Sequence, residues 1–127
     1  MDDRKESNES PRRKMSEMIS EIGAGFISVG KSLEERHNRL TAVCSAWNMA
    51  CVSPENRQKQ LQQFAASYRL FNPAISTDDL ARIVKDMETL INRKLTLFPD
   101  DHRQIVNSRV VPVGKDFRIE VVSVTVQ

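Results

Sequence analysis

The chain has few cysteines and no long apolar run, and both scarcities limit the kind of protein it can be. Its 127 residues contain two cysteines, too few for the disulfide framework of a small secreted domain, so we expect reduced thiols. No run of about 18 apolar residues is present, and no apolar stretch follows a basic start at the N-terminus. We therefore expect neither a membrane span nor a secretory signal, and we predict a cytoplasmic protein.

An excess of charge of one sign is also lacking. Lysine and arginine total 19, and aspartate and glutamate total 17, which leaves a formal net charge of +2. This charge creates no overall field strong enough to indicate binding to DNA or to an anionic membrane. A nucleic-acid-binding function would therefore depend on a local basic patch. The hydrophobic and charged fractions, 39% and 28%, are those of an ordinary globular protein.

Residues 1–14 differ in composition from the rest of the chain. This stretch, MDDRKESNESPRRK, has one apolar residue, Met1, and cannot offset the entropy cost of becoming ordered. We predict a disordered charged tail over 1–14 and a single domain over 15–127. Within the tail, Ser10 precedes a proline and three basic residues. We interpret this segment as solvated, with phosphorylation or contact with an acidic partner as the alternative.

An amphipathic helix is predicted to begin at the first apolar residue after the tail. Apolar residues recur there at the i, i+3, i+4 and i+7 spacing that places them on one helical face: Met15, Met18, Ile19 and Ile22. The segment GAGFISVG follows at 23–30, and each glycine costs up to about 1 kcal/mol of helix propensity relative to alanine. The helix therefore either ends in this segment or continues weakly through it.

The same region matches the letters of a phosphate-binding loop, GxxxxGK[S/T], at Gly25, Gly30, Lys31 and Ser32. Such a loop must follow a buried parallel strand, whereas the preceding segment has the period of an amphipathic helix. The intervening residues FISV are also unusually apolar for a loop whose amides face phosphate. Ser32 and Glu35 form a capping box for the next helix, so we interpret the match as chance.

Three longer helices are predicted in the middle of the chain. The first spans about 33–51, and the second spans about 54–71 after the N-cap Ser53. The third follows the N-cap Ser76 and is closed by Pro99. We expect the second helix to bury Leu61, Phe64, Ala65, Tyr68 and Phe71. The most regular apolar stripe in the sequence belongs to the third helix: Leu80, Ile83, Val84, Met87, Leu90, Ile91 and Leu97.

Periodicity changes toward β-structure in the last part of the chain, where β-branched residues dominate. We predict strands at about 109–113 and 117–126, joined by the turn GKD, and we interpret 100–106 as a short helix or a polar connector. The alternation of apolar residues slips between Val121 and Val122, which indicates a bulge or burial on both faces. Because a lone hairpin is marginal in water, its open edge must pack on the helices or pair with another strand.

Cys44, Trp47 and Cys51 form the densest group of reactive side chains. Seven residues separate the two thiols, which places them about 10 Å apart along a helix axis, beyond the Cα separation of about 7 Å that a disulfide allows. This spacing also differs from the two to four residues between common zinc ligands. We therefore interpret the group as a packed helix face. The alternatives are a metal site completed by His37 or His102, and a redox or intersubunit role.

Asp100, Asp101 and His102 are the one cluster of proton-transfer or metal-binding groups. A hydrolytic or metal site needs groups that converge from separate elements, and the sequence offers no second group to join these three. We expect a solvated loop and a helix cap here. The prediction is accordingly no catalytic residue, no cofactor, no metal site and no small-molecule substrate, and hence no enzyme.

Basic residues alternate with asparagine and glutamine on the helices predicted at 33–51 and 54–71. If these two faces adjoin, they form a local patch that suits nucleic-acid phosphate. The alternative hypothesis is therefore a nucleic-acid-binding regulator, with the contact residues Arg36, Arg39, Arg57, Lys59 and Arg69.

The predicted fold is α+β and predominantly helical: a three- to four-helix bundle with a C-terminal β-hairpin. We predict a small non-enzymatic module for protein–protein contact or regulation, with a protein partner or self-association into an oligomer. The contact elements are expected to be the N-terminal amphipathic helix and the C-terminal strand, because both are terminal and apolar on one side. The candidate contact residues are Met15, Met18, Ile19, Ile22, Phe117, Ile119 and Val121.

Overall fold

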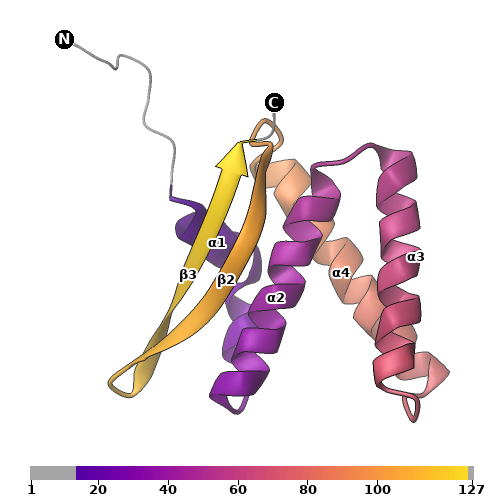
Figure 1. Ribbon diagram of the computed structural model, residues 1–127, viewed down its shortest axis with the longest axis horizontal. Coiled ribbons are helices and arrows are strands. Elements are labelled where there is room, and N and C mark those ends of the chain that lie inside the picture. The colour runs from indigo at the N-terminus through magenta and orange to yellow at the C-terminus, as the bar shows by residue number, and fades with distance from the viewer. Residues whose placement is uncertain (1–13, 126–127) are drawn as a thin grey trace.

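The computed structural model describes residues 14–125 and confirms the predicted α+β fold, which is predominantly helical. Four helices precede a two-stranded antiparallel sheet. Figure 1 shows the hairpin on one side of the second helix and the third helix on the other. Most of the predicted tail, 1–13, and position 126 of the predicted last strand lie outside the described residues. In order, the elements are α1 (Met15–Ser28), α2 (Leu33–Ala50), α3 (Pro54–Phe71), α4 (Thr77–Leu97), β2 (Arg103–Val113) and β3 (Asp116–Thr125).

Serine side chains begin three of the helices, as their sequence signals predict. The Ser32 hydroxyl accepts a hydrogen bond from the backbone N–H of Glu35 at 3.0 Å, and Ser76 accepts one from Asp79 at 3.0 Å. Ser53 caps α3 in the same way. Each bond satisfies a backbone donor that a helix leaves unpaired in its first turn, so these helix starts follow from local chemistry.

Helix α1 continues through the glycine-containing segment and ends at Ser28. Gly23 lets α1 and α2 approach closely, because a Cβ placed there would lie 2.7 Å from a methyl carbon of Val43. Gly25 is an ordinary helical residue that faces open space. The stretch between Gly25 and Gly30 is therefore largely helical rather than a loop around phosphate, which supports the interpretation of the letter match as chance.

The core forms where α1, α2, α4 and the hairpin meet. Trp47 of α2 is fully buried, and its ring centroid lies 6.0 Å from that of Phe98, the residue after α4. Cys44 is buried beside it, and Cys51 is half-buried. This burial confirms that the group is a packed helix face. The largest fully buried side chains are Trp47, Lys94, Ile19, Ile22, Ile27, Leu40, Met87 and Val43.

Helix α3 lies at the periphery of the molecule (Figure 1). Leu61 is its one buried residue, and Phe71 at its end is 80% exposed, so the predicted burial of Phe71 is wrong. Leu97, at the end of α4, is exposed as well. Both residues are at the C-terminal end of an apolar stripe, where the described structure leaves them uncovered.

The first strand begins earlier than its composition indicates. β2 starts at Arg103, so the prediction of a short helix or a connector over 100–106 is wrong for residues 103–106. The side-chain amide of Asn48 on α2 pairs with the backbone of Ile105, accepting from its N–H at 2.8 Å and donating to its carbonyl at 2.9 Å. These residues are 57 positions apart, so no local pattern reveals the contact.

Antiparallel pairing joins β2 to β3 from Arg103–Thr125 to Val113–Asp116. The turn is two residues long, and Gly114 has the positive φ, +61°, that such a turn needs at its first position. A bulge lies between Ile105 and Asn107 in β2. It sits opposite Val122, so the predicted bulge is present but lies in β2; along β3 the burial keeps its alternation, with Ser123 half-buried and Val122 and Val124 exposed.

Candidate interaction surface

The apolar face of α1 lies inside the fold. Met15, Met18, Ile19 and Ile22 are all buried in the core that α1 shares with α2, α4 and the hairpin. These four residues were candidates for contact with a partner, but in this fold they contact the rest of their own chain. The surface that α1 leaves uncovered is instead polar and small, and it includes Ser16, Glu17, Ser20 and Ala24.

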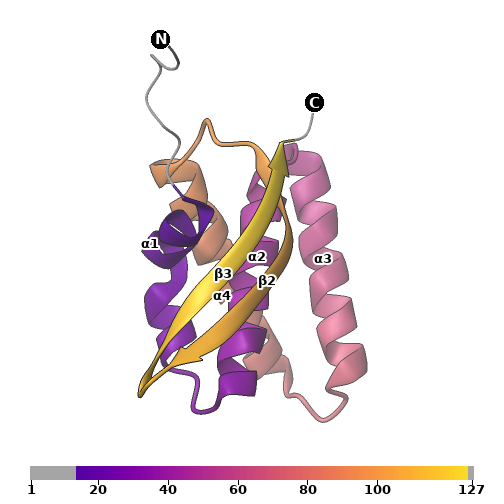
Figure 2. The ribbon, with the colours of Figure 1, turned by 60° about the vertical axis from the view of Figure 1, so that its left-hand side comes forward.

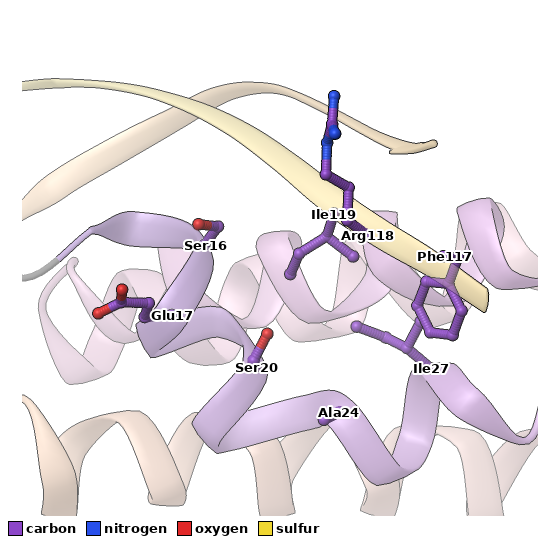
Figure 3. Close-up of a pocket in the computed structure, with 8 residues that line it drawn as sticks. All are labelled: Ser16, Glu17, Ser20, Ala24, Ile27, Phe117, Arg118 and Ile119. Carbon is purple, nitrogen blue, oxygen red and sulfur yellow. The ribbon is translucent and has the colours of Figure 1, made fainter. Parts of the chain in front are cut away.

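Phe117, Ile119 and Val121 on β3 are partly buried and pack against the core. Two of them border a groove of about 540 Å³ between α1 and β3. In Figure 3, Phe117 and Ile119 point toward α1 and lie over Ile27, whereas Arg118 points away from the groove. The structure thus brings Phe117 and Ile119, but not Val121, to an open groove, with the small side chains of α1 on its other wall.

The outer edge of β3 has backbone groups that face away from β2. A two-residue turn is closed by a hydrogen-bonded pair, here Val113–Asp116, and hydrogen-bonded pairs then alternate with pairs whose N–H and C=O groups point outward. Phe117, Ile119 and Val121 belong to the outward set. The Phe117 N–H bonds to the Asp116 carboxylate at 2.8 Å. Within residues 14–125, no hydrogen bond engages the N–H of Ile119 or Val121.

The outer edge of β2 differs, because α2 covers its first half. Besides the Asn48 amide at Ile105, the indole N–H of Trp47 donates to the carbonyl of Arg103 at 2.8 Å. Pro112, near the turn, has no N–H to leave unpaired. Figure 2 shows this difference in position, with β3 on the side of α1 and β2 on the side of α2 and α3. The hairpin therefore has one edge that is covered along its first half and one open edge.

Two of the arginines in the nucleic-acid hypothesis are bound to nearby backbone and aromatic rings. Arg36 donates from Nε to the carbonyl of Gly30 at 3.0 Å, and its guanidinium lies 4.6 Å from the Phe117 ring centroid. Arg39 donates to the carbonyl of Phe26 at 3.1 Å and lies 4.7 Å from that ring. Both guanidinium groups therefore stabilise the region where α1 meets α2.

Arg57 is a cap for the end of α2. Its guanidinium donates to three carbonyls at distances of 3.0 to 3.2 Å, those of Met49, Ala50 and Val52. Lys59 and Arg69 are exposed on α3. Of the five basic residues, three are therefore held within the fold, and the structure does not gather all five into one free patch.

Burial makes the two thiols poor nucleophiles. It raises the pKa of Cys44 to about 11, against a smaller opposing effect of a hydrogen bond with Ser108. Burial also raises the pKa of Cys51. A thiol with such a pKa is almost entirely protonated at neutral pH, and the thiolate is the reactive form. The surroundings of both cysteines therefore favour a packing role.

Lys94 is a buried cation that sequence reasoning missed. It is 1% exposed, and its Nζ donates to the carbonyls of Phe98 at 2.8 Å and Asp101 at 2.6 Å. The ammonium also lies 4.9 Å from the Trp47 ring centroid. The sequence did contain a signal, since Lys94 continues the apolar stripe of α4 after Leu90 at helical spacing. Through these contacts, Lys94 stabilises the connection between α4 and β2 against the core.

The acidic cluster at 100–102 is divided between surface and interior. Asp100 and His102 are exposed, whereas the Asp101 carboxylate turns inward and accepts from Arg103 Nε at 3.0 Å and from the Arg103 N–H at 3.1 Å. Across residues 14–125, no three His, Cys, Asp or Glu side chains come together as a metal site would require. His37 is exposed on α2. Asp101 thus orders the start of β2.

The fold and the groove define a class: a helical α+β protein whose hairpin has one open strand edge beside a helix. No protein-family model matches the chain, and neither the curated proteins nor the solved structures contain a match. None of the described helices combines the length and the apolar character needed to cross a membrane. The functional argument therefore depends on the geometry of the surface.

Proposed function

We propose that this chain is a non-enzymatic protein–protein interaction module that binds an extended segment along the groove between α1 and β3. The observation that carries the proposal is the open edge of β3, where the N–H groups of Ile119 and Val121 lack partners among the described residues and face outward. An exposed strand edge is a template for an added strand. In that mode of recognition, backbone hydrogen bonds supply affinity and neighbouring pockets receive alternate side chains.

The groove has the features that such a segment requires. Phe117, Ile119 and Ile27 supply an apolar floor, and small side chains on α1 leave space for the incoming chain (Figure 3). Ser16 and Ser20 supply hydroxyl groups at the rim. A bound strand would cover apolar surface and satisfy backbone donors at the same time, and both effects favour binding.

Protein contact has more support than nucleic-acid contact in this arrangement. Three of the five basic residues of that hypothesis, Arg36, Arg39 and Arg57, donate to backbone carbonyls of their own chain. A groove floored by Ile27 and Phe117 offers little to phosphate, which prefers cations and backbone amides. The open edge of β3 offers hydrogen-bonding groups that an extended polypeptide can match.

The proposal is tested by filling the groove from its helical wall. Ala24 is exposed on α1 and lines the groove, so Ala24→Arg introduces a long side chain there without removing core packing. Ala81 is exposed on α4, and Ala81→Arg is the matched control on a different helix surface. The full-length wild type and both variants are immobilised and used for native capture with mass analysis of everything retained.

We expect wild type and Ala81→Arg to retain the same protein, and Ala24→Arg to lose most of it. Retention that is equal for all three chains would contradict binding in the groove. A retained nucleic acid whose binding weakens steeply with salt would favour the nucleic-acid hypothesis instead.

A further inference from the structure

The outer face of β3 has a charge pattern that is complementary to itself. Arg118 and Glu120 lie two residues apart on this face, and Arg118 Nη2 donates to the Glu120 carboxylate at 2.9 Å. Arg109 stands opposite Glu120 on β2 and donates to the same carboxylate at 2.6 Å. Arg118 and Glu120, two of the three charged residues of β3, therefore stand beside the open edge with opposite signs.

We propose that the extended segment bound at this edge is β3 of a second copy of the same chain. The two strands pair antiparallel about a two-fold axis at Ile119, and the two hairpins become one four-stranded sheet. In this arrangement Ile119 lies opposite Ile119 of the second copy, and Phe117 lies opposite Val121. All three residues belong to the outward set, so their outward-facing N–H and C=O groups meet, and the Phe117 N–H exchanges its bond with the Asp116 carboxylate for one to the second copy. This inference rests on the proposed function, because it uses the same groove and the same edge.

The charges favour this register over those with the axis at Arg118, Glu120 or Val121, and an axis at Phe117 would pair Asp116 with Arg118 but leave Glu120 opposite Gly114 of the turn. With the axis at Ile119, Arg118 of each copy lies opposite Glu120 of the other, which creates two equivalent ion pairs across the new strand boundary. Moving the axis to Arg118 would place two arginines opposite each other, and moving it to Glu120 would place two glutamates opposite each other. Moving it to Val121 would place both charged residues opposite valines. Opposite charges stabilise a directly facing cross-strand pair and like charges destabilise it.

The opposite face of the new sheet is apolar in the same register. Phe117, Ile119 and Val121 are only partly buried in the single chain. Pairing places them against the same residues of the second copy, above the small side chains of Ser20 and Ala24. The interface thus has an apolar side facing α1 and a charged side facing solvent. Its strand contact is short, so we expect a dimer that dissociates on dilution.

Charge reversal with cross-complementation tests the pairing. In Arg118→Glu, residues 118 and 120 are both acidic, and in Glu120→Arg both are basic, so each variant alone faces like charges at both pairs. In a mixture of the two variants, the acidic residues 118 and 120 of one chain face the basic residues 120 and 118 of the other, so both cross-strand pairs again have opposite charges. Arg118 is 63% exposed, so its reversal leaves the core intact. Arg82→Glu on α4 is the control with the same change in net charge as Arg118→Glu.

Sedimentation equilibrium of the full chain is measured for wild type, each variant and the equimolar mixture. We expect wild type and Arg82→Glu to form a dimer, each reversed variant to bind itself about tenfold or more weakly, and the mixture to recover the affinity of wild type. Hydrogen exchange of the backbone amides in wild type is a second test that needs no variant. We expect the N–H groups of Ile119 and Val121 to become protected from exchange as the protein concentration rises.

A wild type that stays monomeric up to about 1 mM, with rapid exchange at Ile119 and Val121, would overturn the inference. So would a dimer that both reversed variants retain, or one that Val122→Ser abolishes, since Val122 is exposed on the outer face rather than at the groove. These outcomes leave the proposed function intact if native capture still depends on Ala24. The proposed function fails separately, when neither a second copy nor another protein binds in a way that Ala24→Arg reduces.

Discussion

Replacing Lys94 by methionine tests whether the buried ammonium stabilises the fold. Methionine retains the length and the apolar stem of the side chain but removes both hydrogen bonds to the carbonyls of Phe98 and Asp101. It also removes the cation from the face of Trp47. Because all of these partners belong to the junction between α4 and β2, the variant separates the contribution of charge from that of packing.

The expected magnitude follows from opposing contributions. Hydrogen bonds from a charged donor contribute about 1.5–3 kcal/mol each, and a desolvated cation–π contact contributes about 2 kcal/mol. Against these stands the cost of burying an ammonium, which amounts to several kcal/mol even after relaxation. The two carbonyls also lose their donor in the variant. We expect Lys94→Met to lower the free energy of unfolding by about 2–3 kcal/mol, which lowers Tm by roughly 8–12 °C in a chain of this size.

Urea denaturation followed by the fluorescence of Trp47 measures this difference, since Trp47 is the single tryptophan and lies beside the ammonium. The control is Lys85→Met, the same substitution at an exposed position of the same helix, for which we expect a change within about 0.5 kcal/mol. If Lys94→Met were as stable as wild type or more stable, the cost of desolvation would exceed the contribution of its contacts, and the assigned role would be wrong.

Two further predictions concern the core between α1 and α2. Gly23→Ala should destabilise the protein by about 1–3 kcal/mol, because its Cβ would meet Val43 at 2.7 Å, whereas Gly25→Ala should stabilise it by about 0.5–1 kcal/mol, because that Cβ faces open space in a helix; equal effects in urea denaturation would refute the close approach. For Cys44, the raised folded pKa of about 11 means that the protonated thiol is favoured in the folded state. Stability from this group is complete below the unfolded pKa near 9.0 and is lost as pH rises toward 11, so the free energy of unfolding should fall with a slope of up to about 1.4 kcal/mol per pH unit in that range. The slope should become shallower in Cys44→Ala, where only Cys51 retains a thiol with a raised pKa, and a slope equal in wild type and variant would assign it to other groups.

Elements whose boundaries depend on local chemistry were predictable from the sequence. The N-caps Ser32, Ser53 and Ser76 begin α2, α3 and α4 as predicted, because a cap needs only a side-chain oxygen and a backbone N–H three residues later. The packed face around Trp47 followed from helical spacing in the same way. These features depend on residues within one or two turns of each other.

The features that the sequence did not reveal depend on contacts between distant segments. The first half of β2 is held by Asn48, 57 residues away, so its composition alone indicated a connector. The apolar stripe that begins at Met15 was correctly placed on one helical face, but only the tertiary structure shows that its own chain covers it. Phe71 shows the opposite error, because it was predicted to be buried and is exposed. A regular apolar stripe predicts which face of a helix is buried, but not whether another element covers the end of that face. For the candidate site, Ile119 was identified, while its groove with α1 was not.

The covering of α1 changes which part of the terminal elements can meet a partner. Because Ile19 and Ile22 are inside the core, the part of α1 that a partner can reach includes the small residues that face the groove. In the proposed complex, α1 therefore forms one side of the groove. α2 occupies the first half of the β2 edge through Asn48 and Trp47, whereas the N–H groups of Ile119 and Val121 on β3 have no partner within residues 14–125. A strand that docks there must match an arginine followed two residues later by a glutamate. A second copy of β3 that runs antiparallel places its own Glu120 opposite Arg118 and its own Arg118 opposite Glu120, and this match is the basis of the proposed self-association.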